Sequence, residues 1–307
     1  MSSSVTQVEA ARRQMVAAAR AIIKSGAISR SGHGNMSIHL LGTDTMLLTN
    51  VANLEDLDAD RLPLVTLGGR VVDGELDPIS AEIIGMHAVV YERNPDMGAV
   101  IHTHAPYATV YAVADKPIEC WYEGLARFGL TDTIPVAKYG PRGSRESVTN
   151  IADVIDERTR GVLLQNHGVL TFEHDVMSAV RVLVMMEEAA ELGLRAEAIG
   201  GPTLISREAI EYTQQRAQEF AARYGYRKAT TSLEAALADP EVDIVYVATP
   251  HNHHHRHALL AIEAGNHVLV EKPIAISEPE ARQIAAAAQE AGVFCMEALW
   301  TLFLPKY

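Results

Sequence analysis

The hydrophobic positions of the first 200 residues change period several times, as expected when helices and strands alternate. Apolar residues recur at helical spacing over residues 8–24, and Gly26 is expected to end that helix. The same pattern predicts further elements, which are helices at 81–91, 152–156 and 177–197 and strands at 46–49, 64–67, 98–104 and 161–165. The first part of the chain is therefore predicted to be an α/β domain.

A second pattern begins after the Gly200-Gly201-Pro202 break. The run VDIVYVA at 242–248 is almost continuously apolar, which is typical of a buried parallel strand. The other elements predicted here are helices at 207–223, 233–238, 258–264 and 278–291 and strands at 268–270 and 293–296. This β-α-β-α-β series predicts a parallel sheet covered by helices. We therefore expect two domains, at 1–205 and 206–307.

Composition narrows the class of protein. The 307 residues include 26 Lys and Arg against 39 Asp and Glu, and the net charge of −13 disfavours non-specific binding to nucleic acid or an anionic membrane. No apolar run approaches the length of a membrane span, and the start MSSSVTQVEAARRQ has no signal-peptide apolar region. The two cysteines, Cys120 and Cys295, suggest no disulfide framework. We expect a soluble, cytoplasmic protein with no nucleic-acid or membrane partner.

Three histidines form the strongest chemical signal. His102 and His104 lie two residues apart in the predicted strand 98–104, so both side chains point to one face. His167 follows the predicted strand 161–165. Three neutral imidazoles with one open position are the arrangement expected for catalytic zinc. The alternative is a pair of strand histidines that are only solvated.

Two further segments carry candidate chemistry. Residues 32–37 match G-x-G-x-x-S, but they follow a helix and lead towards a strand, the reverse of the order in a dinucleotide-binding fingerprint. A loop whose backbone N–H groups hold an anionic substrate fits better, with Gly34, Asn35 and Ser37 as contacts, although a structural turn is the alternative. Glu82, in the predicted helix 81–91, could act as a general base or be an ordinary surface glutamate.

In combination, these motifs resemble the class II aldolase/adducin family over about residues 8–202. The resemblance rests on four segments in order, which are SGHGNMSIH (31–39), PISAE (78–82), PDMGAVIHTHAPYAT (95–109) and LLQNHGVL (163–170). It implies a three-layer α/β/α domain and a homotetramer with its active site between subunits. It also implies that His102, His104 and His167 hold Zn²⁺ or another divalent metal, which stabilises an enediolate, and that Glu82 is the acid/base.

The same resemblance suggests further site residues. Thr49 and Ser80 are added as substrate contacts, and Tyr122 as a proton donor from a neighbouring subunit, the alternative for Tyr122 being an ordinary interface aromatic. The chain also departs from the family, with Val51-Ala52 for Thr-Gly, Ser80-Ala81 for two serines and His39 for an arginine. Several phosphate donors are thus missing. The expected substrate is a small hydroxy-carbonyl compound, either a sugar or a sugar-phosphate-like molecule.

The second part resembles the Gfo/Idh/MocA oxidoreductases, which are NAD(P)-dependent, over about residues 216–307. The matching segments are VDIVYVATP (242–250), GNHVLVEKP (265–273) and MEALWTLFLP (296–305). A partial Rossmann-like parallel α/β segment is implied. The Gly-rich turn that holds the dinucleotide in such folds is not found, so we predict neither NAD(P) binding nor a cofactor-binding residue, and a vestigial role for Lys272. The His-rich run at 251–257 is interpreted as a polar helix start, with adventitious metal binding as the alternative.

These expectations favour a zinc-dependent class II aldolase-type lyase that cleaves or forms a C–C bond. A decarboxylase or dehydratase would use the same metal chemistry. Two alternatives of other classes are a non-catalytic, adducin-like assembly module and a residual NAD(P)-dependent oxidoreductase.

Overall fold

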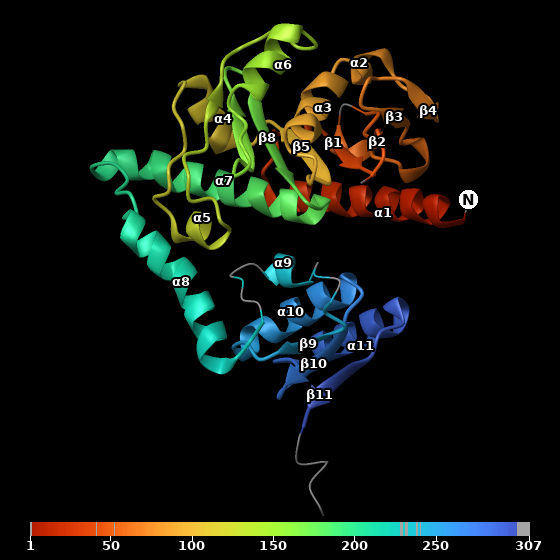
Figure 1. Cartoon of the computed structure of the whole chain (residues 1–307), viewed down its shortest axis with the longest axis vertical. Coiled ribbons are helices and arrows are strands. Elements are labelled where there is room, and N and C mark those ends of the chain that lie inside the picture. The colour runs from red at the N-terminus through yellow and green to blue at the C-terminus, as the bar shows by residue number, and fades with distance from the viewer. Residues whose placement is uncertain are drawn as a thin grey trace, which may run out of the picture. The chain divides into compact units, whose positions relative to one another are not determined.

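A computed structural model describes residues 2–40, 42–51, 53–227, 230, 233–237, 239 and 241–299. The chain forms two compact units, residues 1–216 and 217–307 (Figure 1). Ala52, Ala238 and residues 300–305 of the C-terminal motif lie outside the described residues. No described helix is both long enough and apolar enough to span a membrane.

The first unit is built on one eight-stranded sheet in the order β4-β3-β2-β1-β5-β8-β7-β6. Its strands are β1 (Gly34–His39), β2 (Thr45–Leu48), β3 (Leu64–Thr66), β4 (Val71–Asp73), β5 (Ala99–Thr103), β6 (Val136–Ala137), β7 (Gly161–Leu164) and β8 (Gly168–Glu173). Neighbouring strands are antiparallel except for β6 and β7. On the central strand β5, His102 lies opposite Asn35 of β1 and Leu170 of β8.

Helices cover both faces of this sheet and create two hydrophobic cores. The helices are α1 (Ser2–Ser25), α2 (Pro78–Ala81), α3 (Ile84–Arg93), α4 (Pro106–Val113), α5 (Glu123–Arg127), α6 (Arg145–Ala152) and α7 (Val176–Ala196), with 3₁₀ turns η1 (Leu54–Asp56), η2 (Ala59–Arg61) and η3 (Glu197–Ile199). One core joins the sheet to α1, α4 and α7, and the other joins it to α3 and α6 (Figure 1). This is the three-layer α/β/α arrangement expected from the sequence.

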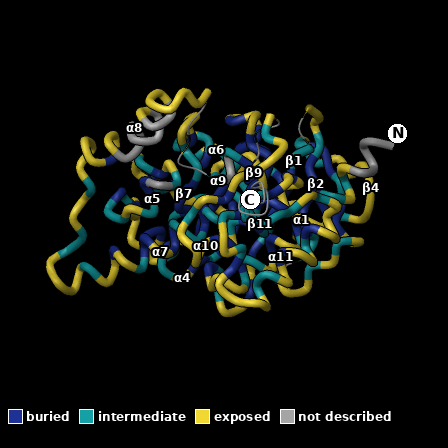
Figure 2. Tube along the Cα trace, turned by 90° about the horizontal axis from the view of Figure 1, so that it is seen from below, coloured by how far each residue is buried: buried dark blue, intermediate teal, exposed yellow. Residues whose placement is uncertain are grey.

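The alternation of side chains along β5 determines on which face of the sheet His102 lies. Ala99 and Ile101 belong to the core under α1, α4 and α7, whereas Val100 belongs to the core under α3 and α6. His102 follows Val100 by two residues and so lies on the same face. The long helix α7 has buried positions interrupted by exposed ones (Figure 2), as expected for a helix with one face on the core.

Three sequence-based assignments in the first unit need correction. The helix predicted at 81–91 is two helices, α2 and α3, separated by a turn. The helix predicted at 152–156 lies earlier, at α6, because Ser144 caps it by accepting a hydrogen bond from the Ser147 N–H. The segment 32–37 is a loop only at its start, since strand β1 begins at Gly34.

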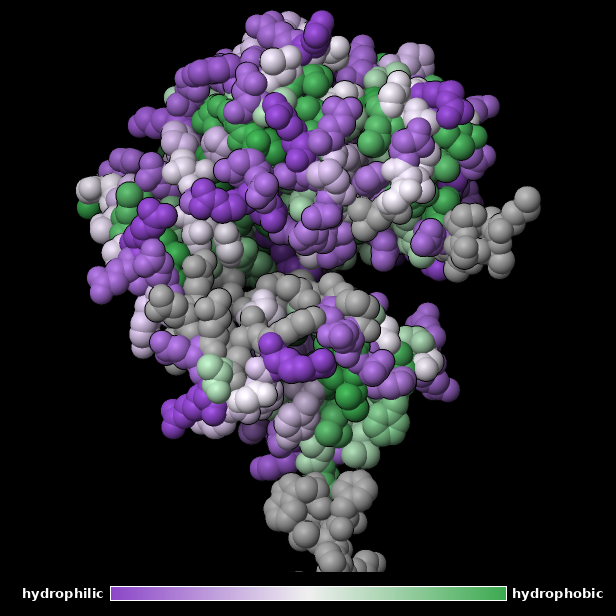
Figure 3. All heavy atoms as spheres, in the orientation of Figure 1, coloured by the Kyte–Doolittle hydropathy of each residue, from purple (hydrophilic) through white to green (hydrophobic). Residues whose placement is uncertain are grey.

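The second unit contains a three-stranded parallel sheet in the order β11-β10-β9. Its strands are β9 (Ile244–Val247), β10 (His267–Glu271) and β11 (Cys295–Ala298), and its helices are α9 (Leu233–Leu237), α10 (His251–Glu263) and α11 (Glu278–Ala291); α8 (Arg207–Tyr224) contains the boundary between the units. A separate core forms between this sheet, α10 and α11. The strand predicted to be buried at 242–248 is only partly so, because Ile244 and Tyr246 of β9 are exposed. Phe294 is exposed as well, and Figure 3 shows hydrophobic side chains on the surface of this unit. This parallel α/β arrangement is consistent with a Rossmann-like segment.

Candidate metal centre and active-site cavity

A cavity of about 540 Å³ lies in the first unit, on the side of the sheet where His102 emerges. Seven of the residues singled out from the sequence line it, namely Gly34, Asn35, Ser80, Glu82, His102, His104 and His167. They come from segments far apart in the chain, so the fold brings together residues that the motifs only suggested.

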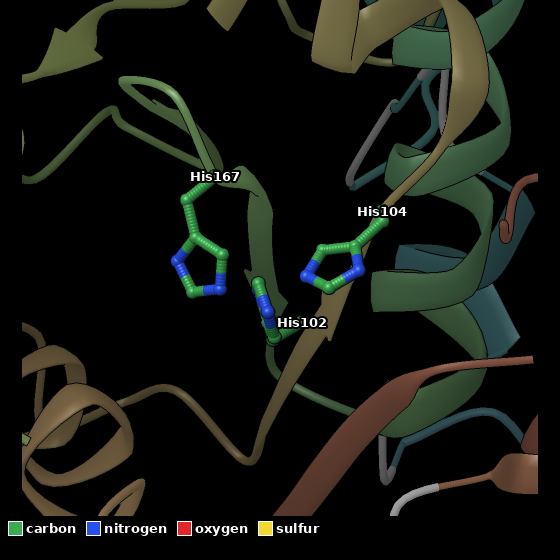
Figure 4. A group of neighbouring side chains, drawn as sticks. All are labelled: His102, His104 and His167. Carbon is green, nitrogen blue, oxygen red and sulfur yellow. The ribbon is translucent and has the colours of Figure 1, made fainter. Parts of the chain in front are cut away.

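The three histidines form one cluster. Each offers a ring nitrogen within 4.8 Å of those of the other two, and the ring centroids lie 4.6 to 5.2 Å apart. Figure 4 shows the rings around a common space. His102 lies on β5 and His104 just after it, whereas His167 lies in the tight turn between β7 and β8, where Asn166 has a φ of 57°. Asparagine tolerates that left-handed conformation better than most residues.

Hydrogen bonding orients the cluster for a metal ion. The Nδ1–H of His102 donates to the Val169 carbonyl oxygen at 2.9 Å, which leaves Nε2 with its lone pair. Metal-bound histidines usually have such a partner on the second nitrogen. His104 Nε2 is buried and has no hydrogen-bond partner in the described part of the chain. A buried nitrogen without a partner is costly, and a divalent cation would satisfy it. The donor set therefore fits a metal.

The electrostatics of the cluster keep the imidazoles neutral. Burial lowers the pKa of His102 well below its usual value of 6.5, and the nearby His167 and His104 lower it further. Burial, together with His104 and Arg142, lowers the pKa of His167 to about 4. The pKa of His104 is also lowered, mainly by burial. Because metal ligation requires deprotonated imidazole, these side chains are ready to bind without losing a proton at neutral pH.

Gly168 completes the geometry of the cluster and was not predicted from the sequence. A Cβ atom at this position would lie 2.6 Å from the Thr103 carbonyl oxygen, 2.7 Å from His104 Cδ2 and 3.2 Å from His102 Cε1. The strand pairing thus leaves no room for a side chain beside the two rings. The signal that could have identified Gly168 is its place directly after His167, in Asn-His-Gly.

Glu82 ends helix α2 at the cavity wall, with its side chain about half exposed. Its Oε2 lies 3.1 Å from Nε of Arg142, whose Nη2 donates to the Ile79 carbonyl oxygen at 2.9 Å. The cavity therefore holds a carboxylate and a guanidinium in contact. No motif marks Arg142 in the sequence, because it reaches Glu82 only through the loop that precedes α6.

Asn35 is held by a chain of buried hydrogen bonds. Its Oδ1 accepts from His87 Nε2 at 2.7 Å, and Ser37 Oγ lies 2.8 Å from His87 Nδ1 and 2.6 Å from the Tyr91 hydroxyl. Burial lowers the pKa of His87 to about 3, so its ring is neutral. The Oδ1 of Asn35 is thus occupied, and its Nδ2 amide remains as a donor for the cavity.

Three predicted site residues do not line the cavity. Ser37 is fully buried in the chain just described. Thr49 is fully buried as well, and its Oγ1 accepts a hydrogen bond from the Met36 N–H at 3.0 Å. Tyr122 lies at the start of α5, where its hydroxyl donates to Glu188 at 3.4 Å. In this chain Ser37 and Thr49 lie behind the cavity walls, whereas Tyr122 is partly buried against the core under α1, α4 and α7.

The His-rich segment of the second unit is different. It forms the first turns of α10, as the polar helix start expected from the sequence. The carbonyl oxygens of Pro273 and Thr249 lie 2.8 and 2.7 Å from the two ring nitrogens of His254, so neither nitrogen is available to a metal. Among the described residues, only the His102, His104 and His167 cluster brings three metal-ligating groups together.

Fold and cavity together define a three-layer α/β domain with a three-imidazole site. Residues 13–194 match the profile of the Class II Aldolase and Adducin N-terminal domain, and the chain belongs to this family. Residues 201–299 match the Oxidoreductase family, NAD-binding Rossmann fold. Both resemblances seen in the sequence are thereby confirmed.

Solved structures show the same fold for the first unit. An L-fuculose 1-phosphate aldolase aligns with a TM-score of 0.59 at 23% identity, covering 68% of this chain and 95% of that one. The L-fuculose 1-phosphate aldolase from Glaciozyma antarctica aligns with a TM-score of 0.58 at 20% identity, covering 74% and 96%. At these identities the likeness establishes the fold.

Curated relatives match the second unit. The trans-1,2-dihydrobenzene-1,2-diol dehydrogenase of Danio rerio is 47% identical over 89 residues, which are 29% of this chain and 27% of that protein. The D-xylose 1-dehydrogenase (NADP(+)) of Hypocrea jecorina is 45% identical over 96 residues, 30% of this chain and 25% of that protein. The chain thus spans about a quarter of the length of these relatives.

Proposed function

We propose that the first unit is a metal-dependent class II aldolase-type lyase, which forms or cleaves a C–C bond in a small hydroxy-carbonyl substrate. The observation that carries this proposal is the convergence of three neutral imidazoles and the Glu82 carboxylate on one cavity. A metal site and a carboxylate that can move a proton are the two groups this chemistry needs.

His102, His104 and His167 would hold Zn²⁺ or another divalent ion. When bound, the metal supplies positive charge that stabilises negative charge developing on the substrate oxygens. In the bond-forming direction, the Glu82 carboxylate removes a proton from the carbon beside the substrate carbonyl. The electron pair left on that carbon attacks the aldehyde carbon of the second substrate. In the cleavage direction, the C–C bond breaks and Glu82 returns the proton to the same carbon.

The polar walls of the cavity would orient the substrate. Asn35 and Gly34 line the cavity on the β1 side, and Ser80 lines it from α2, two residues before Glu82. We assign these three residues to substrate binding. The aldehyde oxygen must gain a proton when the new bond forms, and no residue of the cavity is assigned this role.

Tyr122 is the proposed donor of that proton, from another copy of the chain. Because it does not line the cavity of its own chain, the role requires a homo-oligomer, for which we propose a homotetramer. Mixing Glu82→Gln with Tyr122→Phe subunits tests this directly. Mixed oligomers should recover about a quarter of the wild-type turnover, from cavities that combine intact Glu82 with intact Tyr122. Absence of recovery in oligomers shown to be mixed would exclude the role.

The proposed activity is tested by metal quantification followed by a substrate panel. Phosphorylated and unphosphorylated ketoses, aldoses and hydroxy-acids should include a compound that the metal-loaded protein cleaves. Glu82→Gln should retain the metal and lower turnover by about 10²- to 10⁴-fold. A well-folded oligomer that binds no metal would instead favour the non-catalytic assembly module.

The second unit carries no proposed activity of its own. Its match to an NAD-binding family makes one control necessary, and thermal unfolding with and without NAD provides it. We expect no shift of the unfolding midpoint. A concentration-dependent rise would revive the oxidoreductase alternative.

A further inference from the structure

Arg142 lines the cavity, and the lyase chemistry proposed above gives it no part. Among the described residues that line the cavity, it is the one lysine or arginine, and Asp56, Asp77 and Glu82 line the same space. An anionic group that enters therefore meets three carboxylates and a single permanent positive charge. Within the described lining, Arg142 is therefore the one side chain whose permanent positive charge can pair with an anionic substrate.

Only two of the three guanidinium nitrogens of Arg142 are engaged in contacts among the described residues. Its Nε contacts Glu82 and its Nη2 donates to the Ile79 carbonyl oxygen, whereas Nη1 has no partner among the described residues. Both side chains of the ion pair are about half exposed, at 50% and 52%. Exposed ion pairs contribute little net stability, so a carboxylate or phosphate offering two oxygens can compete with Glu82 for this guanidinium.

The same contact affects Glu82. The Glu82 Oε2 that contacts the Arg142 guanidinium is not free to approach a substrate C–H while this contact lasts. Arg142 lies on the loop before α6, next to Gly143, whose own backbone packs against Glu82: a Cβ added at Gly143 would lie 3.3 Å from Glu82 Cβ. The loop thus holds the arginine over the carboxylate.

We propose that Arg142 binds an anionic group of the substrate, a carboxylate or a phosphate, and in doing so releases Glu82. Arg142 then determines substrate specificity and also restrains the base. Glu82 is released only when an anionic substrate occupies the cavity. The release of the base rests on the proposed function, whereas the anion site stands on the geometry alone.

Binding measurements test the anion site without turnover. Isothermal titration calorimetry of the full-length, metal-loaded protein would use inorganic phosphate and succinate as anionic probes and glycerol as a neutral one. Arg142→Met should weaken binding of at least one anion by about tenfold or more. The matched control is Arg282→Met, because Arg282 forms an exposed ion pair with Glu278 in the second unit, and it should leave binding unchanged. The anion that loses affinity identifies the group that Arg142 recognises.

The proposed release of Glu82 from Arg142 leads to a second prediction, which an arginine with a purely structural role would not satisfy. Glu82→Gln removes the competing carboxylate and should tighten anion binding several-fold. In the Glu82→Gln/Arg142→Met double variant this gain should vanish, because it arises from freeing Arg142. If the gain in anion affinity persists in the double variant, it comes from the lost negative charge alone. That result would overturn the proposed competition between Glu82 and the anion for Arg142.

Three outcomes separate this inference from the proposed function. Unchanged affinity for both anions in Arg142→Met, with metal content and circular dichroism like those of the wild type, would overturn the anion site even if the protein is an active lyase. Arg142-dependent anion binding in a protein without lyase activity would support the anion site and remove the base from the proposal. If Arg142→Met does not fold, Arg142→Lys keeps the charge without the planar fork and should still weaken binding.

Discussion

Both units of this chain contain several histidines, and among the described residues only those of the first unit form a cluster of three metal-ligating groups. The second unit has five histidines within residues 251–257, whereas the first uses His102, His104 and His167. On helix α10 the rings spread around the helix or stack along it, as His253 and His257 do at a centroid distance of 5.4 Å. In the first unit, a strand and a hairpin turn direct three rings to one point.

The comparison shows that convergence of ring nitrogens matters more than the number of histidines. In the described residues His255 Nε2 of the His-rich run is also buried without a partner, but it belongs to no group of three metal-ligating side chains. His254 contacts a carbonyl oxygen with each nitrogen. His102 engages only Nδ1 in this way, and His104 Nε2 has no partner in the described residues. Nitrogens that are available and converge can hold a metal, and in the described part of the chain the run on α10 brings no three such groups together.

The strongest way to break this comparison is to remove a histidine from each segment. His102→Ala and His167→Ala should each weaken zinc binding by about 100-fold or more, since each removes one of three ligands. The matched variants His253→Ala and His257→Ala should leave the tightly bound zinc unchanged. Chelator competition followed by elemental analysis measures both. Equal zinc loss from the two segments would contradict the assignment.

A smaller effect is expected from Gly168→Ala, which keeps all three ligands and disturbs their positions. The new methyl group would collide with the Thr103 carbonyl and the His104 ring. We expect a loss of about 1–3 kcal/mol in the free energy of unfolding and weaker zinc binding. Gly68→Ala is the control, because its Cβ would meet only Thr66 Oγ1, at 3.9 Å. Denaturant unfolding and zinc titration distinguish the two, and an undisturbed Gly168→Ala would refute the packing argument.

The smallest effect concerns the buried chain behind Asn35. Burial lowers the pKa of His87 from 6.5 to about 3, so between these values the unfolded chain binds a proton that the native state does not. Native stability therefore falls as the pH drops below 6.5, by up to about 1.4 kcal/mol per pH unit from this residue. His87→Gln keeps a donor for Asn35 without the titration and should give a shallower slope. Urea unfolding between pH 7 and 5 measures it, and parallel slopes would argue against a neutral His87.

Local patterns predicted the part of the site that depends on strand geometry. Side chains two residues apart on a strand point to the same face, so the pairing of His102 with His104 follows from the sequence alone. The same alternation places Ser37 on the face of Asn35, yet it does not reveal that Ser37 is covered by His87 and Tyr91. Burial of that kind depends on how α3 packs on the sheet, which no local pattern contains.

Arg142 and the position of α6 illustrate the remaining gap. The sequence pattern suggested a helix at 152–156, but the Ser144 cap starts the helix earlier, at Arg145. The loop before α6 brings Arg142 to Glu82 across 60 positions of the sequence. Contacts of this length arise from tertiary packing, so the most informative charge in the cavity was the one that the sequence did not indicate.

We expect the metal to bind in the cavity of the first unit and not at the His-rich helix α10. Anomalous diffraction from crystals of the zinc-loaded protein tests this expectation most directly. We predict a peak bonded to ring nitrogens of His102, His104 and His167 at about 2.0–2.1 Å, the usual zinc–histidine distance. A peak at residues 251–257 with none at the triad would contradict it.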